Sequence, residues 1–250
     1  MRENLPHSRQ APPAVEAQGL CRRYGRTWAL AGVDLRVERG VGLLVAGRNG
    51  SGKSTLLRVL AGALRPDLGS LRIDGRPERD EIKRRTGLLG HASYTYEPLS
   101  AFQNLAVFTQ MLGLSSNRDA LMARLAQVGM AEHADKPVHS FSAGMRKRLA
   151  LARTLLQEPA VLLLDEPYGQ LDPEGFKLLD ELAAAARARG SAVIIASHEL
   201  ARAARLCDQA VVLERGRVRW RGPSRELVGG SAFSATLGLS ADASPSQEVV

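Results

Sequence analysis

The sequence predicts an α/β fold, in which a mostly parallel sheet alternates with helices and is interrupted by a helical insertion. Two apolar runs, Pro159–Asp165 and Ala192–Ala196, show no alternation of polar and apolar residues. Such runs are typical of parallel strands that are covered on both faces. Between Pro98 and Gln157 the apolar residues instead recur at helical spacing, without a strand pattern.

The N-terminal part of the chain predicts strands, turns and two helices. Residues 1–16 are polar and interrupted by proline, and we expect them to be disordered. Short antiparallel strands are expected near Ala17–Leu20 and Val33–Val37. The elements expected next are a strand over Val41–Ala46, a helix from Lys53 to about Leu64, a strand over Ser70–Asp74, a charged helix over Asp80–Arg85 and a strand over Thr86–His91.

The second half predicts the inserted helices and the remainder of the core. The insertion contains helices over Ala101–Leu112, Arg118–Val128 and Ser142–Gln157, and Ser142 suits the N-cap of the third. Later elements are helices over Pro173–Gly190 and Glu199–Leu206, then a hairpin of Ala210–Glu214 and Arg217–Trp220. The tail from about Gly229 is rich in Ser, Ala and Gly, so we expect residues 229–250 to be flexible and residues 17–228 to form the folded domain.

Composition limits the class of protein. The formal charge of +8 comes mostly from arginine spread along the chain, which favours a solvated surface over contact with nucleic acid or anionic lipid. The two cysteines, Cys21 and Cys207, do not make a disulfide framework and suit a reducing cytosol. Residues 1–13 lack the apolar region of a secretory signal, and the longest apolar runs are too short to cross a bilayer. We therefore expect a cytoplasmic protein.

One stretch matches the phosphate-binding pattern G-x-x-x-x-G-K-[ST], between an apolar strand and a helix. Its residues are Gly47, Arg48, Asn49, Gly50, Ser51, Gly52, Lys53, Ser54 and Thr55. Glycines let backbone N–H groups converge on a phosphate, and the helix adds the positive end of its dipole. Lys53 is expected to reach the β- and γ-phosphates, and the Ser54 hydroxyl to ligate Mg²⁺.

Two adjacent carboxylates, Asp165 and Glu166, stand at the C-terminal end of a predicted buried strand, where ligands bind in open α/β sheets. We expect Asp165 to hold the Mg²⁺ shell and Glu166 to polarise the attacking water. The alternative is that they end the strand and cap the next helix. His198 ends the next strand and should reach the same edge, where it contacts the γ-phosphate unless its role is structural.

An aromatic residue, Tyr24, lies shortly before the phosphate loop. Its ring can stack on a purine base. Packing within a hairpin explains the residue equally well, and this stretch alone leaves both interpretations open.

Taken together, these residues resemble the ATP-binding cassette family, the motor subunits of membrane transporters. The segment Ser142-Ala143-Gly144-Met145 looks like the family signature, with Ala and Met replacing the usual Gly and Gln, and Gly169–Asp172 looks like its dimer loop. Tyr24 matches the adenine-stacking aromatic and His198 the switch histidine.

The resemblance implies an α/β P-loop NTPase (RecA-like) core with a mostly parallel sheet, an antiparallel β subdomain and a helical subdomain inserted at about residues 98–157. It also implies that two copies enclose two ATP molecules with Mg²⁺. Ser142, Gly144 and Asp172 would then contribute to a nucleotide site across the dimer. The implied partners are a second, identical ATPase subunit and integral membrane transporter subunits, which hold the protein at the inner face of the cell membrane.

The sequence departs from the family where a glutamine normally ligates Mg²⁺, because His91 stands there. An imidazole can ligate a metal or hold a water molecule, so the metal role of His91 stays open. Leu-Gly-His at this place, followed by Leu99–Leu105, resembles the ATPase subunit of the haem exporter in cytochrome c maturation.

Two other classes of protein fit the sequence less well than a transporter ATPase does. A soluble cassette protein acting on nucleic acid or ribosomes usually carries two cassettes or a long coiled-coil insertion, and neither is present in this chain. A small-molecule kinase with a phosphate loop gives no reason for the segment Phe141–Arg148.

Overall fold

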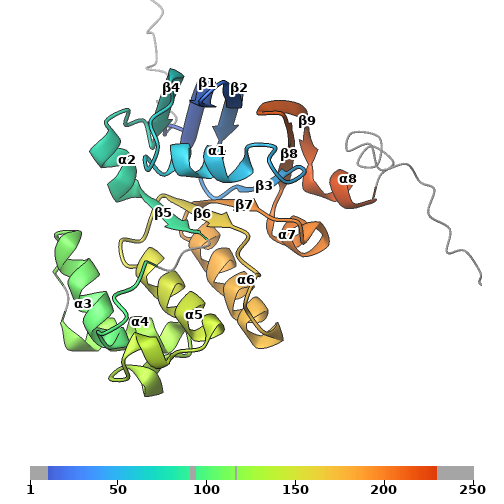
Figure 1. Cartoon of the computed structure of the whole chain (residues 1–250). Coiled ribbons are helices and arrows are strands. Elements are labelled where there is room, and N and C mark those ends of the chain that lie inside the picture. The colour runs from blue at the N-terminus through green and yellow to red at the C-terminus, as the bar shows by residue number, and fades with distance from the viewer. Residues whose placement is uncertain (1–10, 91–93, 116, 230–250) are drawn as a thin grey trace, which may run out of the picture.

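A six-stranded sheet forms the centre of the molecule, with strand order β5-β6-β7-β3-β8-β9 (Figure 1). The computed structural model describes residues 11–90, 94–115 and 117–229. Neighbouring strands are parallel except for the antiparallel pair β8 and β9. The strands are β3 (Gly42–Ala46), β5 (Thr86–Leu89), β6 (Val161–Asp165), β7 (Ala192–Ala196), β8 (Gln209–Glu214) and β9 (Arg217–Pro223).

A second, antiparallel sheet lies beside the first and has the order β2-β1-β4. Its strands are β1 (Val15–Tyr24), β2 (Thr27–Val37) and β4 (Leu68–Ile73). One hydrophobic cluster joins this sheet, helix α1 (Lys53–Leu60) and one face of the central sheet. In β3, Leu43 and Val45 point into this cluster.

The remaining helices mostly cover the opposite face of the central sheet (Figure 1). Leu44 and Ala46 of β3 point to that side, so both faces of this strand are buried. These helices are α3 (Ala101–Met111), α4 (Arg118–Gln127), α5 (Ala143–Thr154), α6 (Pro173–Ala188), α7 (Leu200–Leu206) and α8 (Ser224–Gly229), with two 3₁₀ turns at Ala131–His133 and Val138–Ser140. Helix α2 (Arg79–Arg85) instead packs into the first cluster through Ile82. The predicted α/β fold with parallel strands and a helical insertion is confirmed.

Side-chain caps begin each inserted helix. Ser100 and Gln103 form a reciprocal capping box at α3, with hydrogen bonds of 3.1 and 2.9 Å. Asn117 accepts a 2.8 Å bond from Ala120 N at α4. At α5, the Ser142 hydroxyl accepts a 3.2 Å bond from the backbone N–H of Met145, which confirms the predicted N-cap.

Several boundaries differ from those the sequence predicts. β1 begins at Val15, inside the segment 1–16 that we expected to be disordered, because Val15 is fully buried and pairs with Val37 and Ile73. Both strands of the first hairpin are longer than predicted. α1 ends at Leu60 rather than Leu64, because Gly62 adopts a left-handed φ of 66°.

The C-terminal helix α8 was not predicted. It ends at Gly229, where the flexible tail was expected to begin. Residues 1–10 and 230–250 lie outside the described residues, as does His91.

Candidate active site

The phosphate loop connects the end of β3 to the start of α1. Gly47, Gly50 and Gly52 have φ values of 146°, 77° and 111°, which side chains rarely adopt. A Cβ atom at Gly52 would lie 2.4 Å from the Ala29 carbonyl oxygen, and one at Gly47 would lie 2.3 Å from that of Leu213. A Cβ atom at Gly50 would meet nothing within 4 Å. The glycines therefore let the loop curl against β2 and β8.

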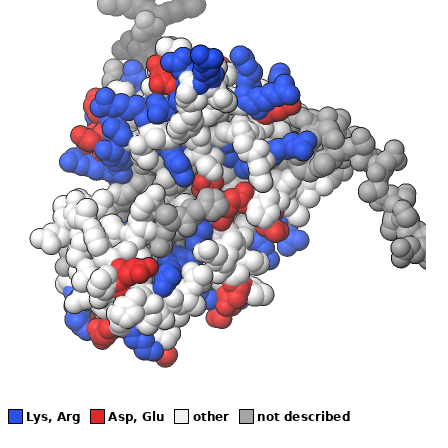
Figure 2. Space-filling view, in the orientation of Figure 1, with Lys and Arg blue, Asp and Glu red and all other residues white. Residues whose placement is uncertain are grey.

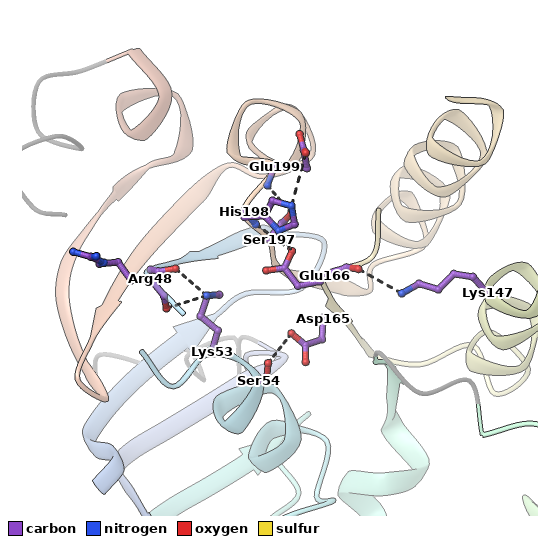
Figure 3. A network of polar contacts seen from close by, with 10 residues as sticks. Arg48, Lys53, Ser54, Lys147, Asp165, Glu166, Ser197, His198 and Glu199 are labelled. Carbon is purple, nitrogen blue, oxygen red and sulfur yellow. Dashed lines mark hydrogen bonds and ion pairs between the residues drawn. The ribbon is translucent and has the colours of Figure 1, made fainter. Parts of the chain in front are cut away.

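The start of α1 is suited to an anion. Within the described chain no side chain caps this helix, and its first turn carries no acidic residue, so the positive end of the dipole is not compensated. Lys53 Nζ donates to the carbonyl oxygens of Gly47 at 2.8 Å and Arg48 at 3.2 Å (Figure 3). The buried ammonium group is thus held inside the loop. The side chain of Arg48 points away from Lys53 (Figure 3), so any contribution of Arg48 to phosphate binding would come from its backbone.

Ser54 and Asp165 meet at the edge of the sheet. Ser54 Oγ donates to Asp165 Oδ1 at 3.0 Å, and Asp165 is 3% exposed. A hydroxyl and a carboxylate oxygen at this spacing are hard donors of the kind that Mg²⁺ prefers. The described residues contain no cluster of three or more His, Cys, Asp or Glu that would hold a metal ion, whereas Mg²⁺ usually needs only one or two carboxylates beside substrate phosphates.

Glu166 and His198 form a direct pair. Glu166 Oε2 accepts a 3.2 Å bond from the backbone N–H of His198 and lies 2.7 Å from its Nδ1 (Figure 3). A carboxylate only accepts, so the imidazole N–H is the donor in the second contact. Glu166 has a left-handed φ of 46°, which costs about 1–2 kcal/mol for a residue with a Cβ atom. Such strain persists where the surroundings fix the backbone.

These elements open on one cavity of about 760 Å³. It is lined by Tyr24, Ala29, Asn49, Gly50, Gly52, Lys53, Ser54, Thr55, Lys147, Glu166, Gly169, Gln170 and His198. The cavity therefore brings together the phosphate loop, the end of β6, the end of β7 and the end of β1.

Tyr24 lies at the rim of this cavity. It ends β1 and is 47% exposed, and the guanidinium carbon of Arg22 lies 5.3 Å from its ring centroid. An exposed ring facing a cavity is available for stacking, which distinguishes it from a residue buried within the hairpin.

Seven described residues of the expected site lie outside the lining of this cavity: Gly47, Arg48, Ser51, Ser142, Gly144, Asp165 and Asp172. Of these, Ser142, Gly144 and Asp172 belong to neither the phosphate loop nor β6. Ser142 is exposed and caps α5. Asp172 caps α6, accepting a 2.7 Å bond from Gly175 N, and pairs with Arg148 at 3.2 Å. The bond from Gly175, and then Arg148, hold the pKa of Asp172 below its usual value. The expectation that Ser142, Gly144 and Asp172 contact a nucleotide bound by a second copy of the chain stays a prediction.

Sequence reasoning missed Lys147, which lines the cavity from α5. Lys147 is 6% exposed, and its Nζ lies 3.5 Å from Gly90 O and 3.4 Å from Glu166 O (Figure 3). Burial lowers its pKa, while the nearby carboxylates of Asp165 and Glu166 raise it. The position of Lys147 in the sequence could have indicated its burial, because it lies three, four and seven residues before Ala150, Leu151 and Thr154 on the buried face of α5.

The fold and these residues define a phosphate-loop nucleoside triphosphatase. The ABC transporter family model matches residues 30–169, and the chain belongs to this family. The sequence is 37% identical over 235 residues to the daunorubicin resistance ATP-binding protein DrrA3 of Streptomyces coeruleorubidus. The aligned stretch covers 91% of this chain and 74% of that protein.

Two further likenesses agree. The cytochrome c biogenesis ATP-binding export protein CcmA of Xanthomonas campestris pv. campestris is 40% identical over 191 residues, covering 75% of this chain and 88% of CcmA. A solved ATP-binding subunit of an ABC transporter superposes with a TM-score of 0.79 at 27% identity, covering 92% of this chain and 95% of that one. The chain is thus an ATP-binding subunit that hydrolyses ATP to power transport. Among the described residues, no helix has the length and apolar character needed to cross a membrane.

Proposed function

We propose that Glu166 is the general base of ATP hydrolysis and that His198 contacts the terminal phosphate. The observation that carries this proposal is the convergence of the Glu166–His198 pair, Lys53 and Tyr24 on one cavity of about 760 Å³. A carboxylate at the end of a strand can accept a proton from a water molecule aligned with the γ-phosphate.

Each residue has a separate task in this scheme. Tyr24 stacks on the adenine ring, and Lys53 with the N–H groups at the start of α1 binds the β- and γ-phosphates. Glu166 orients the attacking water, while His198 moves from the Glu166 carboxylate to the terminal phosphate when nucleotide enters. Ser54 and Asp165 would hold Mg²⁺, which supplies positive charge beside the phosphate oxygens. His91 keeps its expected metal role only as a proposal, since it lies outside the described residues.

The functional unit in this proposal is a homodimer. Ser142 and Asp172 are exposed and lie away from the cavity of their own chain. The start of α5, capped by Ser142 with Gly144 in its first turn, offers backbone N–H groups to the γ-phosphate bound by a second copy. ATP then joins the two copies, and loss of its terminal phosphate releases them.

An apolar surface on the helical insertion supports a membrane partner. The members of this surface are Tyr94, Tyr96, Met111, Leu112 and Leu114, which are 73%, 45%, 66%, 36% and 39% exposed. It adjoins a hollow of about 290 Å³ partly lined by Phe108 and Met111. Figure 2 shows few charged side chains over α3, while Lys and Arg gather over the two sheets. We propose that an apolar cytoplasmic segment of integral membrane subunits docks here and holds the protein at the inner face of the cell membrane.

Met111→Glu tests this docking surface, because it places a charge on the most exposed residue of α3 in the apolar surface. Affinity-purified wild type should carry polytopic membrane subunits identified by mass spectrometry, and Met111→Glu should lose them while keeping ATP affinity. Gln110→Glu on the same helix is the matched control. Equal recovery of membrane subunits with both variants contradicts the docking surface, and ATPase activity that depends on RNA would favour a soluble role.

The cargo we propose is haem, exported in cytochrome c maturation. The segment Leu99–Leu105 and the 40% identity to CcmA support this proposal. The daunorubicin resistance relative, which covers more of the chain, supports export of a drug-like amphiphile as the second candidate. Deleting the gene separates them: loss of covalent haem in periplasmic cytochromes c supports haem, and intact cytochromes with raised sensitivity to amphiphilic drugs supports the alternative.

A further inference from the structure

Arg202 of α7 closes a half-buried cluster that connects three segments of the chain. Its Nη1 pairs with Asp180 Oδ2 at 2.8 Å, and its guanidinium carbon lies 5.6 Å from the Tyr168 ring centroid and 4.9 Å from that of Phe176. The other carboxylate oxygen of Asp180 accepts a 2.9 Å bond from the Tyr168 hydroxyl. Tyr168 and Phe176 meet edge to face at 5.5 Å. Removing Arg202 would therefore break the ion pair with Asp180 and take the guanidinium group away from both rings.

The cluster lies close to both members of the catalytic pair. Tyr168 follows Glu166 by two residues on the loop that leaves β6, and Arg202 follows His198 by four residues on α7. Phe176 and Asp180 belong to α6, which lies beside α7 (Figure 1). A shift of α7 relative to the loop after β6 would therefore change the separation of Glu166 and His198.

The backbone near Glu166 needs such support. β6 and β7 pair as far as Asp165 and Ala196, and Glu166 N still donates to Ala196 O at 2.8 Å. The pairing of β6 with β7 ends there, and Glu166 itself has the strained φ of 46°. A left-handed residue outside a turn holds its conformation only when neighbouring contacts fix it. The contacts between Tyr168 and Arg202 fix the backbone on the C-terminal side of Glu166.

The contacts within the cluster are directional. Burial, and next the carboxylate of Asp180, raise the pKa of Tyr168, so its hydroxyl stays protonated and donates. The planar guanidinium both pairs with Asp180 and stacks on aromatic rings, which an ammonium group cannot do equally well. A partly buried ion pair adds little net stability, so the effect of the Arg202–Asp180 pair lies in the geometry that it fixes.

We infer that Arg202 is a positioning residue for ATP hydrolysis. It acts through Asp180 and Tyr168 to hold the Glu166 and His198 side chains at the separation seen in the structure. This inference rests on the roles proposed for Glu166 and His198. Arg202 itself lies outside the lining of the nucleotide cavity, so its removal should leave ATP binding nearly unchanged.

The test compares kcat and KM for Mg²⁺-ATP in Arg202→Met and Arg202→Lys, with Arg205→Met on the exposed side of the same helix as the control. Arg202→Met should lower kcat about 10- to 100-fold, as misplaced catalytic groups do, with KM nearly unchanged. Arg202→Lys should recover part of kcat because its ammonium group can still pair with Asp180. Wild-type kcat in Arg202→Met overturns the inference.

A double-variant cycle separates positioning from general stability. In a His198→Ala background, Arg202→Met should reduce kcat less than it does in wild type, because both changes act on one pair. An equal reduction in both backgrounds overturns the inference. If Arg202→Met does not fold, Tyr168→Phe, which removes one oxygen atom, is measured in the same two backgrounds with the same criteria. Normal turnover in Glu166→Gln and His198→Ala would instead reject the proposed catalytic roles.

Discussion

Ser54 Oγ donates a 3.0 Å hydrogen bond to Oδ1 of Asp165, a residue 111 positions later in the chain. The bond joins the first turn of α1 to the end of β6. It brings together two oxygen atoms of the kind that a hard cation prefers. The phosphate loop and the acidic strand therefore contribute to one site.

Lys53→Ala should weaken ATP binding. The ammonium group makes charge-assisted hydrogen bonds, and losing them should raise the ATP dissociation constant about 10- to 100-fold. Isothermal calorimetry measures the change, and Lys177→Ala, at an exposed lysine of α6, is the control. Unchanged affinity in Lys53→Ala would show that the loop binds nucleotide without this side chain.

Two glycines of the loop should differ in their tolerance of alanine. Both have positive φ, so Gly50→Ala should lower the free energy of unfolding by about 1–2 kcal/mol. Gly52→Ala should lower it further, because its Cβ atom would lie 2.4 Å from the Ala29 carbonyl oxygen. Urea denaturation compares the two, and equal losses would contradict the close approach of β2 to the loop.

The two cysteines should react differently with alkylating reagents. Burial raises the pKa of the Cys207 thiol to about 12, whereas Cys21 is only partly buried. At pH 8 the reactive thiolate of Cys207 should be about one part in 10⁴. Mass spectrometry after iodoacetamide treatment should find label on Cys21 first, and on Cys207 only after unfolding. Equal labelling of the folded protein would contradict the burial of Cys207 at the end of α7.

The cap of α6 should make stability depend on acidic pH. The N–H of Gly175 holds the pKa of Asp172 below its usual value. Because the pKa is lower in the folded state, the ionised cap stabilises the protein above the unfolded-state pKa, about 3.9, and this stabilisation is lost as the pH falls through the folded-state pKa.

Asp172→Asn tests this dependence, because asparagine keeps the capping oxygen and removes the charge. The difference in unfolding free energy between wild type and Asp172→Asn should be largest near neutral pH and should shrink below about pH 4. A difference that stays constant over this range would show that the charge of Asp172 does not contribute.

The buried core was the easiest part to predict from the sequence. The bounds of β7 coincide with the predicted strand Ala192–Ala196, because a strand covered on both faces consists of consecutive apolar residues. The phosphate loop was equally predictable, because its glycines are required by the backbone conformation of the loop itself. Such features depend on neighbours in the sequence.

Features that depend on distant contacts were missed. α8 has only six residues, and tertiary contacts hold it: Leu227 is buried, and Ser224 Oγ donates to the carbonyl oxygens of Ala204 and Cys207. The place of Arg202 likewise follows from the packing of α7 against α6 and the loop after β6, which no local pattern encodes.

Glu166→Gln tests the central claim most directly. Loss of the general base should lower kcat by about 10²–10⁴ and leave ATP affinity intact. Because the γ-phosphate then persists, size-exclusion chromatography with light scattering should find a stable dimer in Mg²⁺-ATP, while Glu199→Gln behaves as wild type. A Glu166→Gln protein that stays monomeric and hydrolyses ATP at the wild-type rate would contradict the account.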